Sequence, residues 1–162
     1  MSELLKRIVE RDHVLFRDHI ETWQEAVRQS TLPLVKTGYV TEDYYRQIVS
    51  CIETYGPYVV FDHQVAMPHT TENAEGVLKT AVSFMRVKDP VSFGFDEDGV
   101  EKTASLFFTL AAENPEEHLN NIQNLVGIFT NEELLDALMT ASSKEDILAA
   151  DAAHPCTGFQ ED

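Results

Sequence analysis

Residues 56–69 read GPYVVFDHQVAMPH, and this stretch decides the fold. The Gly56-Pro57 pair ends a preceding helical pattern, because neither residue type continues a helix well. Residues 58–61 are rich in strand formers, Asp62-His63 is typical of a turn, and residues 64–67 predict a returning strand. That strand runs into Pro68-His69, so the chain presents a histidine at a strand end behind a proline that fixes its entry.

Helical patterns precede this stretch. Apolar residues at helical spacing predict a short helix around residues 4–9, a second that starts at Thr22, and a third over about residues 42–55. Thr22 and Glu25 fit a capping box, in which each side chain satisfies the backbone N–H of the other residue. Pro33 should end or bend the second helix. A strand or an extended link is predicted for residues 13–16.

Strands and then helices follow the histidine. Residues 80–87, 91–95 and 104–112 predict three strands, with turns at Lys88-Asp89-Pro90 and at residues 96–99. Three helices are predicted after Asn114, Asn131 and Ser143, which are good N-cap residues. The order of elements predicts a single-domain α/β fold, a mixed β-sheet flanked by helices on both faces. We expect the domain to span residues 1–150 and residues 151–162 to form a flexible C-terminal tail.

Composition narrows the function classes. No run approaches the roughly 18 apolar residues of a membrane span, and the N-terminus lacks the apolar centre of a secretory signal, so we expect a cytoplasmic protein. Cys51 and Cys156 have no neighbouring Cys or His at a metal-ligand spacing, which argues against a disulfide or a zinc site. The net charge of −16 argues against nucleic acid. It favours a basic protein partner, or it serves solubility alone.

Common catalytic signatures are absent. The sequence contains no GxGxxG, P-loop, GxSxG or HExxH motif, and we expect neither a cofactor nor a metal. Asp96 and Asp98 lie in a turn that either binds calcium weakly or, as we prefer, is a solvated loop. Among the histidines, His13 and His19 lie in a polar N-terminal region, and we assign them no role.

Two histidines remain as candidates for chemistry. His69 follows a strand and a proline, and a neutral imidazole so held can act as a nucleophile or a base. His118 precedes Ile122 and Leu125 at helical spacing, which places it on the apolar face of the helix after Asn114. The alternatives are a turn histidine for His69 and a core histidine for His118. The sequence alone does not show whether the two rings meet.

Several motifs together resemble the active-site region of phosphotransferase-system enzyme IIA, in the mannitol–fructose class and closest to its ascorbate-type branch. The GPY of residues 56–58 and the AMPH of residues 66–69 are similar to that family's G-P-Y and A-[ML]-P-H patterns. Residues 75–80 (EGVLKT) resemble its E-G-V-x-x-T, and residues 88–91 (KDPV) resemble its K-x-P-V turn. Residues 21–27 (ETWQEAV) are similar to the first long helix of the ascorbate branch.

The resemblance implies a function and a site. Family members accept phosphate from the phosphocarrier protein HPr on the histidine of Pro-His and pass it to an enzyme IIB, which serves a membrane enzyme IIC permease. His69 would then be the phosphorylated residue of a phosphotransferase, and His118 would match the second histidine that holds the phosphoryl group. Many relatives carry an arginine just after Pro-His, whereas this chain has Thr70-Thr71. We therefore expect backbone N–H groups, His118, Thr70 and Thr80 to support the phosphate.

Two other functions stay open. A regulatory enzyme IIA-like protein would use the phosphorylation state of His69 to control a partner instead of sugar transport. A non-catalytic acidic binding module would leave His69 as a turn residue. The sugar itself is not readable from the sequence, because the family's IIA component does not contact it.

Overall fold

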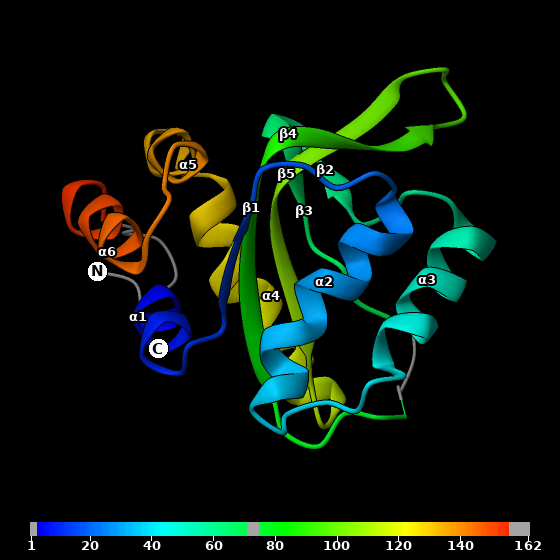
Figure 1. The fold of residues 1–162 in the computed structure, drawn as a ribbon, viewed down its shortest axis with the longest axis horizontal. Helices are drawn as coiled ribbons and strands as arrows, with labels where there is room; N and C mark the ends of the chain where they lie inside the picture. Colours follow the sequence, from blue (N-terminus) through cyan, green and yellow to red (C-terminus); the bar gives the residue numbers. More distant parts are fainter. Residues whose placement is uncertain (1–2, 71–74, 156–162) are drawn as a thin grey trace.

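The computed structural model describes residues 3–70 and 75–155, which form one α/β domain with a five-stranded mixed sheet (Figure 1). The helices are α1 (Glu3–Glu10), α2 (Trp23–Lys36), α3 (Tyr44–Tyr55), α4 (Pro115–Phe129), α5 (Glu132–Met139) and α6 (Lys144–Ala153). The strands are β1 (Val14–Arg17), β2 (Val60–Phe61), β3 (Val65–Ala66), β4 (Ala81–Phe95) and β5 (Glu101–Ala111), with a 3-10 turn η1 (Asp62–Gln64).

The sheet has the order β1-β4-β5-β3-β2. β1 runs parallel to β4 and β3 runs parallel to β5, whereas the pairs β4–β5 and β2–β3 are antiparallel. The predicted mixed sheet is therefore confirmed. Within residues 56–69, β2 and β3 form a hairpin at one edge of the sheet. His69 follows β3 and therefore lies beside the central strand β5, with which β3 pairs.

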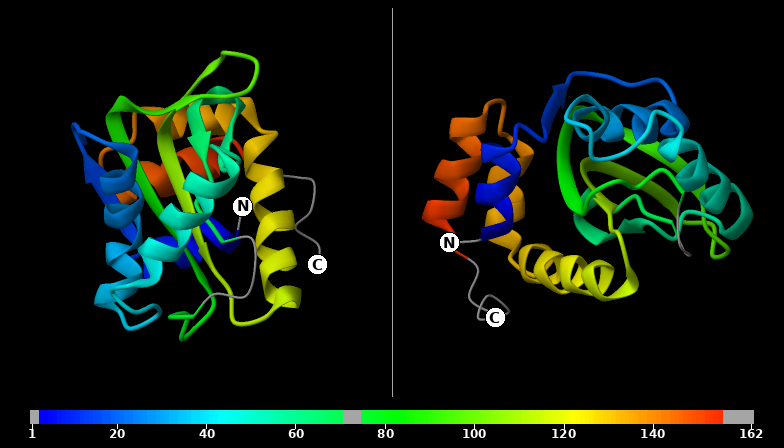
Figure 2. Two further views of the ribbon diagram at one scale, coloured as in Figure 1. Left: turned by 90° about the vertical axis from the view of Figure 1, so that its right-hand side faces the viewer. Right: turned by 90° about the horizontal axis from the view of Figure 1, so that it is seen from below.

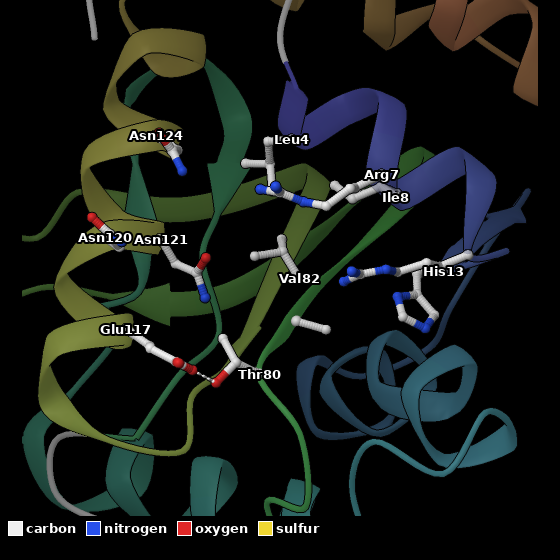
Figure 3. A pocket seen from close by; sticks show the side chains of 12 residues that line it. Leu4, Arg7, Ile8, His13, Thr80, Val82, Glu117, Asn120, Asn121 and Asn124 are labelled. Carbon is white, nitrogen blue, oxygen red and sulfur yellow. Dashed lines mark hydrogen bonds between the residues drawn. The ribbon is translucent and has the colours of Figure 1, made fainter. Parts of the chain in front are cut away.

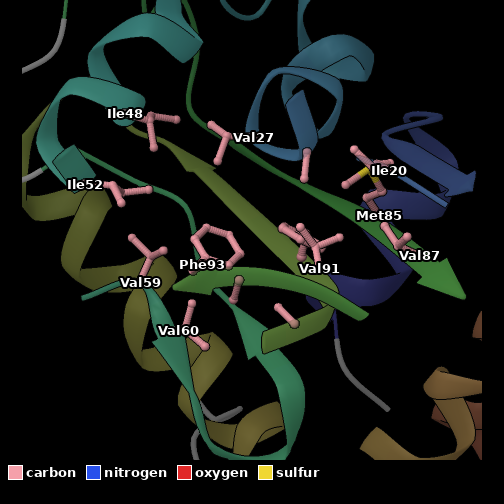
Figure 4. Packing of buried hydrophobic residues seen from close by; sticks show 14 of the residues in the cluster. Ile20, Val27, Ile48, Ile52, Val59, Val60, Met85, Val87, Val91 and Phe93 are labelled. Carbon is pink, nitrogen blue, oxygen red and sulfur yellow. The ribbon is translucent and has the colours of Figure 1, made fainter. Parts of the chain in front are cut away.

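Helices cover both faces of the sheet, as predicted (Figure 2). One core lies under α2 and α3 and includes Val27, Ile48 and Met85 (Figure 4). The other core lies under α1, α4, α5 and α6 and includes Phe84 and Leu125. Phe84 and Met85 are adjacent on β4 and enter opposite cores, because successive side chains of a strand point to opposite faces.

Two predictions about α2 are wrong in detail. Pro33 does not end the helix, which was one of the two outcomes predicted for it, because the buried side of α2 is fixed to the sheet: the Ser83 hydroxyl donates to the Ser30 carbonyl at 2.6 Å, and the Thr109 hydroxyl donates to the Ser30 hydroxyl at 2.7 Å. Tertiary contacts thus override the local preference of proline. Only half of the capping box forms. The Glu25 N–H donates to the Thr22 hydroxyl at 3.2 Å, but the Glu25 carboxylate pairs with Arg28 at 2.6 Å instead of accepting the Thr22 N–H.

The predicted turn at Lys88-Asp89-Pro90 is also wrong. β4 is one strand, and its register with β5 shifts between Arg86 and Val91, where the three residues are exposed. A bulge of this kind tolerates proline because no ladder hydrogen bond needs its missing N–H.

The C-terminal boundary lies later than predicted. α6 continues to Ala153, and the side chain of Asp151 is buried, so residues 151–153 belong to the folded domain and not to a tail. Residues 156–162, including Cys156, lie outside the described residues. Within residues 3–70 and 75–155, no helix has the length and apolar character that crossing a membrane requires.

Candidate active site

His69 is held at the end of the β2–β3 hairpin by backbone hydrogen bonds on both sides. The Met67 N–H donates to the Val59 carbonyl at 2.8 Å, and the Leu110 N–H donates to the Pro68 carbonyl at 3.0 Å. Because β5 is buried from Ala104 to Ala111, this second bond ties the residue before His69 to a rigid support. The histidine is thus fixed by its neighbours along the chain.

The imidazole of His69 has a defined orientation. Its Nδ1 lies 2.6 Å from the carbonyl oxygen of Met67, so Nδ1 carries the proton and donates. The neutral ring then keeps an unprotonated Nε2. Burial lowers the pKa of His69, the bond to Met67 acts in the opposite direction, and the nearby His118 lowers the pKa further. No lysine or arginine of the described residues is among the groups that shift this pKa.

His118 meets His69 at the start of α4. The helix begins at Pro115, and the Asn114 side chain caps it by accepting the Glu117 N–H at 2.9 Å. The two imidazole rings lie 5.5 Å apart between centroids, tilted by 44°. Burial lowers the pKa of His118. The structure therefore brings together the two histidines that the sequence proposed as a pair, and both favour the neutral form at neutral pH.

Two tyrosines complete the support and were not identified from the sequence. The Tyr58 hydroxyl donates to the His69 carbonyl at 2.5 Å, and its ring meets the His69 ring edge-on at 5.2 Å between centroids. The buried Tyr44 hydroxyl donates to the Leu110 carbonyl at 2.6 Å. Tyr58 belongs to the GPY motif, and this motif was the one indication of a role in the site. Because tyrosine is also a common strand residue, the motif did not by itself indicate a hydrogen bond to His69.

The two threonines differ in their surroundings. Burial raises the pKa of Tyr44, and a hydrogen bond with Thr70 acts against this rise, which places Thr70 beside Tyr44. The Thr80 hydroxyl donates to the Glu117 carboxylate and accepts the Glu113 N–H at 2.9 Å. Both partners of Thr80 lie in the segment from β5 into α4, and neither is a histidine.

The arrangement suits a nucleophilic imidazole. A fixed, neutral ring with one free nitrogen is prepared to attack an electrophile, and a second neutral imidazole lies within reach of any charge that arrives. The capped N-terminus of α4 adds the positive end of a helix dipole near His118.

Comparisons with known proteins identify the family of this chain. The family model for the phosphoenolpyruvate-dependent sugar phosphotransferase system, EIIA 2, matches residues 7–150. The ascorbate-specific PTS system EIIA component of Escherichia coli (strain K12) is 31% identical over 147 residues, which cover 90% of this chain and 93% of that protein.

Solved structures agree as well. A Streptococcus mutans protein assigned as a PTS IIA (PtxA) matches with a TM-score of 0.83 at 27% identity, over 100% of both chains. The complex of enzyme IIAMTL with phosphorylated enzyme IIBMTL from Escherichia coli matches with a TM-score of 0.73 at 29% identity, over 88% of this chain and 95% of that chain. The chain therefore belongs to the EIIA 2 family of the phosphoenolpyruvate-dependent sugar phosphotransferase system, a family of phosphotransfer components.

Proposed function

We propose that this chain accepts a phosphoryl group from HPr on Nε2 of His69 and passes it to an enzyme IIB. The observation that carries the proposal is the bond from Nδ1 of His69 to the Met67 carbonyl, because it leaves Nε2 as the nitrogen with a free lone pair. The lowered pKa of His69 keeps that lone pair available at neutral pH. The neighbouring ring of His118 supports the same role.

The reaction needs no cofactor. The lone pair of Nε2 forms a bond to the phosphorus of phosphorylated HPr, while the bond from phosphorus to HPr breaks and its electron pair returns to the donor nitrogen. In the second transfer a nucleophile of enzyme IIB attacks the same phosphorus, and Nε2 recovers its lone pair. In-line positioning and charge stabilisation supply most of the catalysis in such transfers.

His118 supplies charge when the phosphoryl group arrives. A phosphoryl group brings a charge of about −1.5 to −2. At the 5.5 Å that separates the two rings, one unit charge acting on another contributes about 3 kcal/mol at an effective dielectric constant of about 20, before screening by water. This interaction raises the pKa of His118, which then takes up a proton. Thr70, next in the chain, and Thr80 add hydroxyl donors once their present bonds, to Tyr44 and to Glu117, open.

The surface beside His118 suits a protein partner. Leu119 and Val126 expose 55% and 36% of their area on α4, which offers apolar contacts close to the site. The net charge of −16 favours a carrier that is basic around its own active site. We place the reaction in the cytoplasm, with an enzyme IIB of the ascorbate type as the first acceptor to test and an enzyme IIC permease beyond it.

Labelling by phosphorylated HPr tests the proposal. We expect one phosphoryl group per chain, no labelling of His69→Ala, and unchanged labelling of the control His63→Ala, since His63 lies in the η1 turn, 3.6 Å from Glu132. Labelling of His69→Ala at the wild-type level would refute the assignment. His118→Ala should label more slowly and lose the group faster.

The acceptor needs its own test. Labelled protein mixed with an enzyme IIB should transfer the group, with loss of label from this chain matched by gain on IIB. Stable phosphorylation without transfer to any enzyme IIB, together with phosphorylation-dependent binding of a regulator, would support the regulatory alternative instead.

A further inference from the structure

A cavity of about 280 Å³ lies between α1, α4 and the start of β4 (Figure 3). Neither His69 nor His118 is among its lining residues. It is therefore separate from the proposed phosphorylation site, although both share helix α4. Its lining combines four apolar residues with eight polar or charged ones, and a groove that only faces the core would be apolar throughout.

Two arginines at the C-terminal end of α1 provide positive charge. Arg7 lies in the last turn of α1, and Arg11 directly follows the helix, where its N–H donates to the Arg7 carbonyl at 2.9 Å; both residues line the cavity. Like charges at this spacing repel each other. Within the described residues, no carboxylate lies within ion-pair distance of either guanidinium. In a chain with a net charge of −16, two such neighbouring cations indicate a site for an anion.

A buried amide points into the same space from α4. Asn121 is only 8% exposed, and across residues 3–70 and 75–155 its Nδ2 has no hydrogen-bond partner. Figure 3 shows its side chain directed from α4 toward the cavity. A buried amide donor without a partner costs free energy, and a leucine of similar shape would avoid that cost. The amide therefore indicates a ligand with an acceptor at this position.

His13 offers a hydrogen-bond acceptor, whereas Asn121 offers a donor. The residue is 1% exposed, so the polar N-terminal environment expected from the sequence is wrong: His13 is packed edge-on against Tyr39. The Thr37 hydroxyl donates to the Pro33 carbonyl at 2.9 Å, so Nε2 of His13 donates to the Thr37 oxygen at 2.9 Å. Its Nδ1 is then an acceptor, and no described residue occupies it.

We propose that this cavity binds a small phosphorylated polyhydroxy compound, such as a sugar phosphate. The phosphate lies against Arg7 and Arg11, since guanidinium groups match phosphate oxygens in geometry and charge. Hydroxyl groups, which both donate and accept, meet Asn121 and His13. The Glu117 carboxylate, which accepts from the Thr80 hydroxyl, marks the other end and disfavours a second anionic group there.

The site also has a consequence for the neighbouring chemistry. Glu117 lines the cavity and precedes His118, which meets His69. A ligand that orders this turn of α4 acts one residue from the proposed phosphate-holding histidine. The binding proposal itself does not depend on phosphorylation of His69, so each of the two proposals can fail without the other.

Calorimetric titration of the purified full-length protein tests the proposal with three probes. Glucose 6-phosphate carries both a phosphate group and sugar hydroxyl groups. Inorganic phosphate carries only the phosphate charge, and glucose carries only the hydroxyl groups. We expect saturable binding of glucose 6-phosphate, and binding at least about tenfold weaker for each of the other two. Absence of saturable binding of glucose 6-phosphate would overturn the proposal, and equal affinity for inorganic phosphate would overturn the assignment of a hydroxyl-bearing ligand.

Three variants locate the binding. Arg7→Gln and Asn121→Leu should each weaken the binding of glucose 6-phosphate at least about tenfold, because each removes a direct contact. The control Arg46→Gln removes the same charge from α3, where the arginine side chain is 71% exposed, and should bind normally. Wild-type affinity in both cavity variants would overturn the site.

Thermal unfolding separates a ligand role from a structural one. Asn121→Leu should unfold at the wild-type temperature or above it, since it removes an unpaired buried amide. A clear loss of stability in this variant would show that Asn121 serves the fold, and would overturn its assignment as a ligand contact.

Discussion

Tyr58→Phe should weaken the proposed phosphorylation of His69 without removing it. The substitution keeps the ring that meets the His69 ring at 5.2 Å and removes the hydroxyl that donates to the His69 carbonyl at 2.5 Å. That bond links the segment just before β2 to the backbone carbonyl of His69. Without it, the imidazole is still oriented by Met67, but the peptide that carries it is less restrained.

The magnitude follows from a single hydrogen bond. A neutral bond of this kind contributes about 1 kcal/mol net. We expect the free energy of unfolding to fall by about this amount. If the same free energy is lost from the transition state, phosphoryl transfer slows about fivefold. The pH dependence of the rate should be unchanged, because burial, the Met67 carbonyl and His118 set the pKa of His69, and Tyr58 is not among these causes.

The assay is the rate of labelling by phosphorylated HPr, measured beside chemical denaturation. Tyr55→Phe is the matched control: it makes the same chemical change at a residue that is 62% exposed at the end of α3, and it should alter neither quantity. Wild-type rate and stability in Tyr58→Phe would refute the positioning role. Complete loss of labelling in a folded Tyr58→Phe protein would refute the estimate and assign the hydroxyl to the chemistry itself.

Four further outcomes follow from the structure. The labelling rate should fall at acid pH with a midpoint below 6.5, because burial holds the pKa of His69 below its ordinary value; a midpoint above 6.5 in the rate profile would contradict this. On phosphorylation, NMR titration should show that the pKa of His118 rises, since the new negative charge favours its protonated form. Burial lowers the pKa of His13 to about 4, so the unfolded chain binds more protons below pH 6.5, and denaturation should show up to about 3 kcal/mol of stability lost between pH 6.5 and 4. Asn114→Ala should cost about 1 kcal/mol of stability in the same assay, because it removes the N-cap of α4.

Most of the fold was predictable because local signals and packing agree. The Gly56-Pro57 break, the hairpin into Pro68 and the Asn114 cap act within a few residues, and each appears in the structure where the sequence placed it. The errors lie where distant contacts prevail. Pro33 stays helical through bonds to β4 and β5, and Pro90 stays in a strand through a register shift, neither of which is visible in a local pattern.

The two histidines of the candidate site were predictable from the sequence, and their supports were not. A Pro-His at a strand end and a histidine on the apolar face of α4 identified both rings, but only the structure shows that they lie 5.5 Å apart. The hydroxyl of Tyr58 acts on a carbonyl 11 residues away, and that of Tyr44 on a carbonyl 66 residues away. Tyrosines in apolar segments fit a core equally well, so their sequence positions do not distinguish these roles.

The absence of an arginine after Pro-His has a consistent physical interpretation in the proposed function. A permanent cation beside His69 would stabilise the phosphorylated form at every moment, including the moment of onward transfer, when the group has to leave. A neutral His118 with a lowered pKa gives little charge to the empty site and gains a proton as the phosphoryl group arrives. As the group leaves, the field that holds this proton leaves with it. The electrostatic stabilisation of the phosphoryl group by His118 is therefore strongest while the group is bound to His69, and it weakens as the group leaves. A phosphoryl carrier requires this behaviour, because it has to release the group, whereas a site that only stores phosphate does not.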